Sequence, residues 1–443
     1  MIKYIKLKNY KSLIDLEVDF MKTANKPKKM VIIYGENGIG KSNFASVFRT
    51  LNETLMTKSL AEILRNTVER LKEKNPDQNY NELITGLPDG VLKDTEDIIK
   101  ENKTVSSKEN MMIEICFNIK NNDAIYKLEY SNTELVHESL DYVLNKKQVN
   151  YFDITSNSSY LNKNLFKDKT YYKEFLSLME KYWSKHTLLS ILVSELVDKK
   201  EEYLKQKINA SFGDIPAYIT NIVAKVNGGT IRRADFSKSH HSLLDNIEKG
   251  QVPLDERVNL DKTEKVLNHF ITSVYSDVKQ AYYKKEKNGE KITYSLFLKK
   301  QIHDELKEVD FSLESTGTKN LLNVIPSLID ACNGDIVIID EIDTGIHDIL
   351  MTKLIESIPE MLKGQLIITT HNTTLFESSI PASSFYVFNV NHKSEKVLVP
   401  ITDFEGRVHP NLNPRKRYLA GLYGGIPTLI DIDFEEVLDN LEN

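Results

Sequence analysis

A short glycine-rich run restricts the fold of this chain more than any other part of it. Residues 35–42 read GENGIGKS and match the pattern G-x-x-x-x-G-K-[ST] in full. The run follows an apolar stretch rich in β-branched residues, Met30–Tyr34, and precedes residues 42–55, whose pattern predicts a helix. Glycines let a backbone wrap round a phosphate group with its N–H groups pointing inward, and the following helix directs its positive end at the same group. The sequence therefore predicts a strand, a phosphate-binding loop and a helix of an α/β fold.

Each position of this loop has an expected task. Lys41 is expected to contact the β- and γ-phosphate oxygens of a nucleotide, and Ser42 is expected to ligate Mg²⁺. ATP and Mg²⁺ are therefore the expected cofactors. The residues expected to line the phosphates are Gly35, Glu36, Asn37, Gly38, Ile39, Gly40, Lys41, Ser42 and Asn43.

Two later strands are expected to end in polar side chains. The apolar run at residues 336–339 leads into Asp340 and Glu341, and the run at residues 366–370 leads into His371. Ligands of open α/β sheets bind beyond the carboxyl ends of the strands. We expect Asp340 to hold Mg²⁺ through water and Glu341 to orient or deprotonate the attacking water, with His371 at the γ-phosphate.

A fourth segment indicates which family of ATPases the chain resembles. Residues 315–319 read STGTK, which alone is typical of a helix N-cap. They stand one helix before the strand that ends in Asp340, and the order of all four motifs resembles that of ABC ATPases. In that family this segment is the signature loop, which caps the γ-phosphate bound by a second subunit. The resemblance implies that Ser315, Thr316, Gly317, Thr318 and Lys319 act in trans, so we expect a homodimer or higher homo-oligomer.

Further motifs resemble a narrower group. Residues 8–12 read KNYKS, similar to the N-F-[RK]-S opening of SMC/RecF-like and OLD-type ATPases, in which the basic residue, here Lys11, approaches the phosphates. Residues 340–347 read DEIDTGIH, similar to the D-E-x-x-x-G-[LI]-H variant of that group. This resemblance implies a dimer-interface loop that contains Asp343 and His347, although a structural role for His347 is equally compatible with the sequence.

The end of the chain resembles abortive-infection ATPases. Residues 417–427 read RYLAGLYGGIP, similar to the ending of AAA-type proteins such as the RloA and AbiL ATP-binding subunits. The fold class that follows is α/β: an ABC-type P-loop head with a mixed sheet flanked by helices, formed by residues 1–57 and 308–443. Residues 58–307 are expected to form an insertion, with a β-meander at about 110–146, a helical region at about 170–280 and a hairpin at about 277–298.

Composition and net charge restrict the kinds of partner that this protein is expected to have. The net charge is −6, whereas proteins dedicated to nucleic acids are usually basic, so DNA is a possible partner that the charge does not indicate. Lysines around Tyr282 and Tyr283 form the one candidate basic patch, and a solvated hairpin is the simpler interpretation. The two cysteines, Cys116 and Cys332, are expected to be reduced thiols. We see no apolar stretch long enough for a membrane helix, so we expect a cytoplasmic protein without a membrane partner.

Three hypotheses for function follow. The first is the ATPase subunit of an anti-phage defence system, which senses infection through a phage trigger protein and controls a separately encoded effector such as a nuclease. The residues after the last expected strand are too few for the Toprim nuclease domain of OLD proteins. The second is a RecF/SMC-like DNA-repair or DNA-maintenance ATPase. The third, a transporter ATPase, is disfavoured by the D-E-x-x-x-G-x-H variant. The Q-loop and the role of residues 58–307 are not assigned by any motif.

Overall fold

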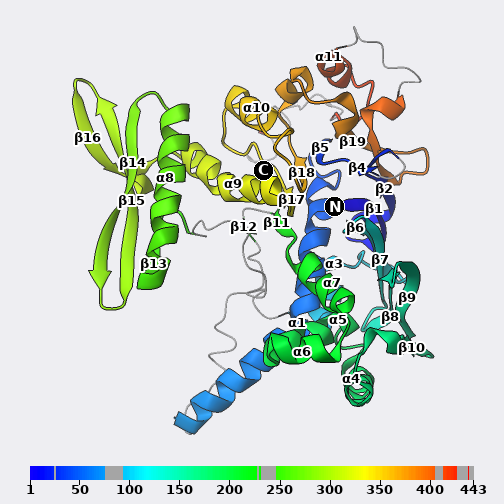
Figure 1. Ribbon diagram of the computed structural model, residues 1–443. Coiled ribbons are helices and arrows are strands. Elements are labelled where there is room, and N and C mark those ends of the chain that lie inside the picture. Colours follow the sequence, from blue (N-terminus) through cyan, green and yellow to red (C-terminus); the bar gives the residue numbers. More distant parts are fainter. Residues whose placement is uncertain are drawn as a thin grey trace.

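The computed structural model describes residues 1–23, 26–74, 93–226, 229–230, 246–404, 413–426 and 438. Two seven-stranded sheets enclose a long helix, and a smaller sheet with its own helix lies to one side (Figure 1). The expected α/β class is confirmed.

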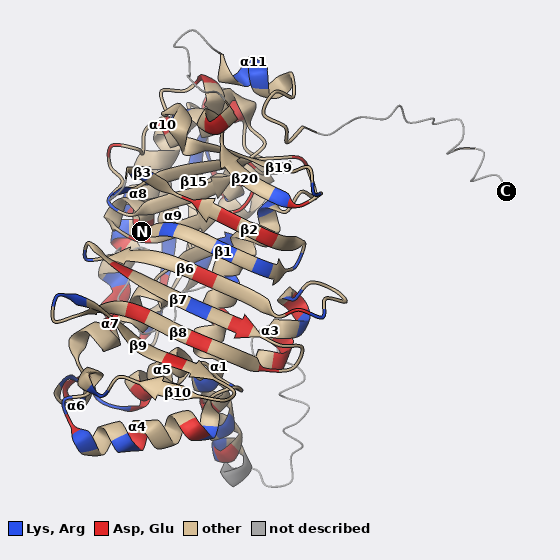
Figure 2. Cartoon of the chain, turned by 90° about the vertical axis from the view of Figure 1, so that its right-hand side faces the viewer, with Lys and Arg blue, Asp and Glu red and all other residues tan. Residues whose placement is uncertain are grey.

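The first sheet is antiparallel and has the order β10-β9-β8-β7-β6-β1-β2. Apolar and polar residues alternate along its strands, so one face packs inward while the other carries charged residues of both signs (Figure 2). The strands of the expected meander lie in the same sheet as the hairpin that β1 and β2 form. Its strands are β1 (Ile2–Tyr10), β2 (Leu13–Asp19), β6 (Met111–Ile119), β7 (Asn122–Tyr130), β8 (Leu135–Leu144), β9 (Lys147–Thr155) and β10 (Ser159–Leu161).

The second sheet is mixed and has the order β12-β11-β17-β18-β5-β19-β20. Its five central strands run parallel, while β12 and β20 are antiparallel edges. Strands β5, β17 and β18 are short, apolar and buried along their whole length, as the sequence pattern predicts. The strands are β5 (Met30–Tyr34), β11 (Val223–Val226), β12 (Gly229–Thr230), β17 (Ile336–Ile339), β18 (Gln365–Thr369), β19 (Phe385–Val390) and β20 (Lys396–Pro400).

Helices cover both faces of the mixed sheet. Helix α1 (Lys41–Lys74) starts at the phosphate-binding loop and runs between the two sheets, where Phe44, Val47 and Phe48 are buried in the same core as Val31 and Ile33. It continues well past the expected end at residue 55. Helices α9 (Thr316–Asn333) and α10 (Asp348–Glu356) pack on the other face against a second core.

The remaining elements support these layers. Helix α8 packs on β14 and β15, whose connection is the hairpin expected at about 277–298, and Phe311 and Leu322 join this small core to the base of α9. The other bounds are α3 (Thr95–Asn102), α4 (Lys169–Tyr182), α5 (Leu188–Asp198), α6 (Glu201–Lys207), α7 (Ala210–Thr220), α8 (Arg257–Val274), α11 (Pro414–Leu419), β3 (Met21–Thr23), β4 (Lys26–Pro27), β13 (Lys249–Pro253), β14 (Val278–Asn288), β15 (Lys291–Ile302), β16 (Glu305–Asp310), and the 3₁₀ turns η1 (Lys163–Leu165), η2 (Leu254–Glu256), η3 (Phe311–Leu313), η4 (Thr373–Glu377), η5 (Ala382–Ser384) and η6 (Ile401–Phe404).

The division into a head (1–57 and 308–443) and an insertion (58–307) stays a prediction, and both large sheets cross its boundaries. Strands β6 to β10 extend the sheet that β1 and β2 begin. Strand β11 belongs to the mixed sheet beside β17, where Ala224 lies opposite Ile338. The segment expected to be inserted therefore contributes strands to the layers that position the site.

One buried carboxylate makes the first sheet sensitive to pH. Glu138 on β8 is fully buried and accepts hydrogen bonds from the Tyr126 hydroxyl (2.8 Å), the Trp183 indole (3.0 Å), and the Leu188 and Leu189 amides (2.6 and 3.3 Å). Burial raises the pKa of Glu138 from 4.5 to about 7, although these hydrogen bonds act in the opposite direction. The folded protein therefore binds a proton that the unfolded chain releases between these two values.

We predict that this carboxyl makes the protein less stable as the pH rises through that window. Relative to Glu138→Gln, wild-type protein should lose on the order of 2 kcal/mol of unfolding free energy between about pH 5 and pH 8. Urea denaturation of both proteins across this range measures the difference. Parallel pH profiles for the two proteins would contradict the prediction.

Candidate nucleotide-binding site

The loop between β5 and α1 has the backbone that a phosphate cradle needs. Gly35, Gly38 and Gly40 have φ angles of 156°, 78° and 124°, a region that other residues rarely adopt. A Cβ atom at Gly40 would lie 3.0 Å from Leu13 on β2, so the first sheet closely backs the loop. The predicted loop is thus in place at the carboxyl end of β5 and opens α1.

Lys41 lies inside this loop. Its side chain is almost fully buried, and its ammonium group donates hydrogen bonds to the carbonyl oxygens of Gly35 (2.8 Å) and Glu36 (3.0 Å). Burial lowers the pKa of Lys41, and the negative charges of Glu341, Asp340 and Asp343 oppose that shift. The ammonium group of Lys41 and the carboxylates after β17 therefore lie close enough for their charges to interact.

A threonine orients the two predicted carboxylate residues. Thr369, at the end of β18, donates from its hydroxyl to Asp340 Oδ1 (2.6 Å) and accepts from the Glu341 amide (2.7 Å). Glu341 has a φ angle of +50°, a left-handed conformation that is strained for residues other than glycine. We infer that the hydroxyl of Thr369 helps to hold this strained turn, which sets the directions of Asp340 and Glu341. No sequence motif assigns a role to Thr369, although a hydroxyl at the end of a buried apolar strand is a usable signal.

We predict that Thr369→Val lowers the ATP hydrolysis rate by about 10- to 100-fold, because both carboxylate residues lose a hydrogen-bond partner that positions them. Steady-state phosphate release measures the effect. The control is Thr370→Val, whose hydroxyl accepts a hydrogen bond from the Asn372 amide (3.0 Å) and does not contact the carboxylates. Equal rates in wild type and Thr369→Val would show that the hydroxyl does not position these groups.

His371 follows β18 at the same edge of the sheet. Its amide donates to Asp343 Oδ2 (3.1 Å), which joins the loop after β18 to the loop after β17. Burial lowers the pKa of His371, and the positive charge of Lys41 lowers it further, while nearby carboxylates oppose the shift. The imidazole is therefore neutral near pH 7, so one ring nitrogen is available to accept a hydrogen bond.

The predicted signature segment is the start of α9. Ser315 caps the helix by accepting a hydrogen bond from the Thr318 amide (3.2 Å), and Ser315 and Thr316 are exposed. Lys319 donates to the Ser312 carbonyl (2.6 Å). Within the described residues, no hydrogen bond or ion pair joins this segment to the phosphate loop of its own chain.

The signature segment instead contacts the predicted interface loop of the same chain. A Cβ on Gly317 would lie only 2.2 Å from the Gly345 carbonyl oxygen, and Asn320 Nδ2 donates to the Thr344 carbonyl (2.9 Å). His347 caps α10 through Nδ1, which accepts from the Ile349 amide (3.3 Å). His347 thus has a structural role, and its place at an interface stays a prediction.

Two lysines lie beside the phosphate loop. Lys11 donates to Ser46 Oγ (3.0 Å) on the second turn of α1, and burial lowers its pKa. Sequence reasoning missed Lys396, which donates to Ser12 Oγ (2.8 Å) and lies 3.4 Å from the Gly38 carbonyl oxygen. Asn43 donates to the same Ser12 hydroxyl (2.7 Å). The turn between β1 and β2 is therefore tied to the start of α1, and the approach of Lys11 to the phosphates stays a prediction.

The candidate DNA-facing patch is partly neutralised. Lys284 pairs with Glu308 (3.0 Å), and Lys285 pairs with Asp261 and Glu264 of α8 (2.8 and 3.0 Å). Tyr283 is buried under α8, and the Tyr282 hydroxyl donates to Glu308 (2.5 Å). These contacts agree with the simpler interpretation, a solvated hairpin.

The site fits a magnesium nucleotide. Mg²⁺ prefers oxygen ligands and usually takes only one or two from the protein, with phosphate and water oxygens as the others. Ser42 supplies a hydroxyl and Asp340 a carboxylate at this edge of the sheet. Among the residues that the structure describes, no group of three His, Cys, Asp or Glu side chains could hold a metal ion by itself. The donors thus suit a metal bound largely through phosphate oxygens.

No helix in the described part of the chain has the length and apolar character needed to cross a membrane.

Several known proteins are similar to this chain. Three solved structures of SMC head domains resemble the chain, at 12 to 14% identity. One is an SMC head bound to the C-winged helix domain of ScpA (TM-score 0.44, covering 91% of this chain and 98% of that chain), and another is the head from Thermotoga maritima (TM-score 0.38, 90% and 98%). The third, from Pyrococcus furiosus, has an extended coiled coil and is bound to the C-terminal domain of ScpA (TM-score 0.37, 100% and 98%). No curated protein matches the chain.

A family model matches more than half of the 443 residues. The family is described as "AAA domain, putative AbiEii toxin, Type IV TA system", and residues 126–377 match it. The matched part contains the signature segment, Asp340, Glu341 and His371, and the phosphate loop precedes it. The predicted resemblance to AAA-type ATPases is confirmed: this chain belongs to the AAA family that carries this AbiEii-related description.

Proposed function

We propose that this protein hydrolyses ATP in a nucleotide-controlled dimer and that this dimer controls a separately encoded effector of an anti-phage or abortive-infection system. The observation that carries the proposal is the meeting of Lys41, Asp340, Glu341 and His371 at the carboxyl ends of three adjacent parallel strands, β5, β17 and β18. The family description, which names an abortive-infection toxin, supports the defence context.

Each residue has a task in the proposed reaction. The loop amides and Lys41 bind the phosphates, and Ser42 and Asp340 hold Mg²⁺, which neutralises phosphate charge when bound. Glu341 accepts a proton from a water molecule whose oxygen attacks the γ-phosphorus, while the bond from that phosphorus to the β–γ bridging oxygen breaks. Neutral His371 orients this water or the γ-phosphate. The products are ADP and inorganic phosphate, and catalysis comes mainly from positioning and charge neutralisation.

The exposed signature segment supports a dimer. In the part of the chain that the structure describes, no hydrogen bond or ion pair joins it to its own phosphate loop, and it packs through Gly317 on the loop that contains Asp343. A second chain that docks this face over the first nucleotide would complete the site with Ser315 and Lys319. In this arrangement each interface loop lies next to the partner's signature segment.

We predict that Gly317→Ala weakens the ATP-dependent dimer by at least about tenfold, because the new methyl group displaces the signature segment from Gly345. ATP binding to the monomer should stay within about twofold of wild type. Mass photometry with and without ATP, combined with calorimetry, separates the two effects. Gly213→Ala in α7 is the control, since its methyl group would meet only Ile208 at an ordinary 3.4 Å. An unchanged dimer in Gly317→Ala would count against a role for this segment in trans.

The defence role is tested by purifying the protein together with the products of its neighbouring genes. An ATP-dependent complex with a second protein, and loss of phage resistance in a Lys41→Ala strain, are the expected results. The RecF/SMC-like alternative would instead be supported by a dimer that co-purifies with no second protein and itself binds duplex DNA in an ATP-dependent and salt-sensitive manner. In that case the wild-type strain and the Lys41→Ala strain would be equally resistant to phage.

A further inference from the structure

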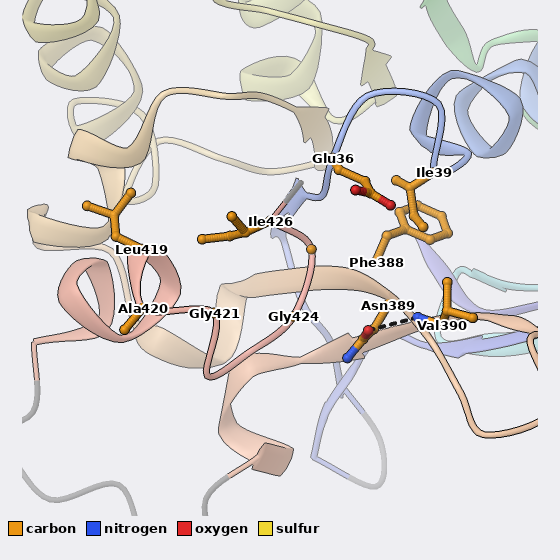
Figure 3. A pocket seen from close by; sticks show the side chains of 11 residues that line it. Glu36, Ile39, Phe388, Asn389, Val390, Leu419, Ala420, Gly421, Gly424 and Ile426 are labelled. Carbon is orange, nitrogen blue, oxygen red and sulfur yellow. Dashed lines mark hydrogen bonds between the residues drawn. The ribbon is translucent and has the colours of Figure 1, made fainter. Parts of the chain in front are cut away.

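A cavity of about 530 Å³ opens beside the phosphate loop, away from the catalytic carboxylates. Figure 3 shows its three walls. The phosphate loop supplies Glu36 and Ile39, and the end of β19 supplies Phe388, Asn389 and Val390. The end of α11 and the segment after it supply the third wall, with Leu419, Ala420, Gly421, Gly424, Gly425 and Ile426. Its volume lies within the range of about 300–1,000 Å³ that is usual for small-molecule sites.

The walls combine apolar surface with two polar side chains. Ile39, Phe388, Val390 and Leu419 present hydrocarbon or aromatic surface, on which a flat heterocycle can be buried. The Glu36 carboxylate is an acceptor of the kind that binds ribose hydroxyls in nucleotide sites. The side chain of Asn389 is oriented by its Oδ1 atom, which accepts a hydrogen bond from the Val390 amide (2.8 Å).

The third wall is packed closely against the phosphate loop. Gly424 and Gly425 have φ angles of +69° and +68°. A Cβ on Gly424 would lie 2.4 Å from Asn389 Nδ2, and one on Gly425 would lie 2.6 Å from Val387 and 3.3 Å from the Gly35 Cα atom. Only glycines allow this approach without displacement of a neighbour.

Side-chain contacts anchor the same segment. The Tyr418 hydroxyl donates to the Gly425 carbonyl (3.0 Å), and the Tyr418 ring lies 5.4 Å from that of Tyr34, the last residue of β5. Arg415 pairs with Glu377 of η4 (3.0 Å). These contacts fix the third wall next to Gly35, the first glycine of the phosphate loop.

We propose that this cavity binds the nucleoside, the ribose and the base, of the nucleotide whose phosphates the loop holds. The C-terminal segment around residues 418–426 is then part of the nucleotide site. The inference rests on the proposed function and deepens it. Two residues of the phosphate loop, Glu36 and Ile39, also line the cavity, so phosphates held by the loop place the nucleoside within reach of the third wall.

The test compares ATP with inorganic tripolyphosphate, which has the phosphates and lacks the nucleoside. Calorimetry with Mg²⁺ measures both ligands on wild type, Val390→Trp, Asn389→Ala and the control Leu422→Trp. Val390 is 46% exposed, so an indole can occupy the cavity without entering the core. Leu422 is 58% exposed in the same segment and does not line the cavity.

We expect Val390→Trp to weaken ATP binding by at least about tenfold and Asn389→Ala by about threefold or more, with tripolyphosphate affinity within about twofold of wild type. Leu422→Trp should change neither affinity. Unchanged ATP affinity in folded Val390→Trp and Asn389→Ala would overturn the inference, as would an equal loss for both ligands, because that result places the damage in the phosphate loop. Failure of wild type to bind either ligand would instead overturn the proposed function.

Discussion

Glu341→Gln is expected to lower the ATP hydrolysis rate by about 10²- to 10³-fold while ATP binding stays close to that of wild type. The amide keeps the size and much of the hydrogen bonding of the side chain, but it cannot accept the proton from the attacking water. Because Glu341 is exposed and lies at a strained turn, the substitution removes no buried contact. The variant should therefore fold normally and accumulate as an ATP-bound dimer.

Phosphate release and mass photometry with ATP measure the two parts of this result. Asp343→Asn is an informative comparison, since Asp343 lies at the same edge of the sheet and accepts a hydrogen bond from the His371 amide. It should reduce hydrolysis less than Glu341→Gln. Hydrolysis by Glu341→Gln at the wild-type rate would mean that another group is the base, and His371 would be the next candidate.

The parts of the site that local patterns encode were predictable. The phosphate loop, the strand that ends before Asp340 and the strand before His371 all lie where the sequence indicated, because buried parallel strands read as continuous apolar runs. Strand order then brings these ends together. Since parallel strands share one carboxyl edge, three correctly predicted strands were enough to predict the meeting of Lys41, Asp340 and His371.

Other parts depend on long-range pairing that no local pattern encodes. Strand β11 pairs with β17 although about 110 residues separate them, as Ala224 and Ile338 show, so nothing near β11 marked it as a central strand. Likewise Lys396 reaches Ser12 across 384 positions of the chain. The partner of a hydroxyl such as Thr369 is decided by side-chain packing between neighbouring strands, which the sequence pattern leaves open.

The C-terminal segment shows the same limit for a motif that was recognised. Its resemblance to abortive-infection proteins was visible in the sequence, but that resemblance gave no physical reason for the glycines. The φ angles of Gly424 and Gly425 and their close approach to Asn389 and Gly35 give these glycines a physical reason. A glycine that permits contact between distant segments has no local signature apart from its identity.

Lys41→Met should weaken ATP binding by about 100-fold or more, the largest effect expected for a single substitution outside the catalytic carboxylates. The change removes a buried positive charge that several carboxylates surround, so no other group of the loop can replace its charge-assisted hydrogen bonds to phosphate. Lys396→Met is the matched control: Lys396 also lies next to Gly38, but its ammonium group is tied to Ser12, on the outer side of the loop. We expect at most about a tenfold loss for Lys396→Met, measured by calorimetry with ATP and Mg²⁺. Equal losses for the two variants would show that net positive charge near the loop, rather than the position of Lys41 inside it, determines nucleotide affinity.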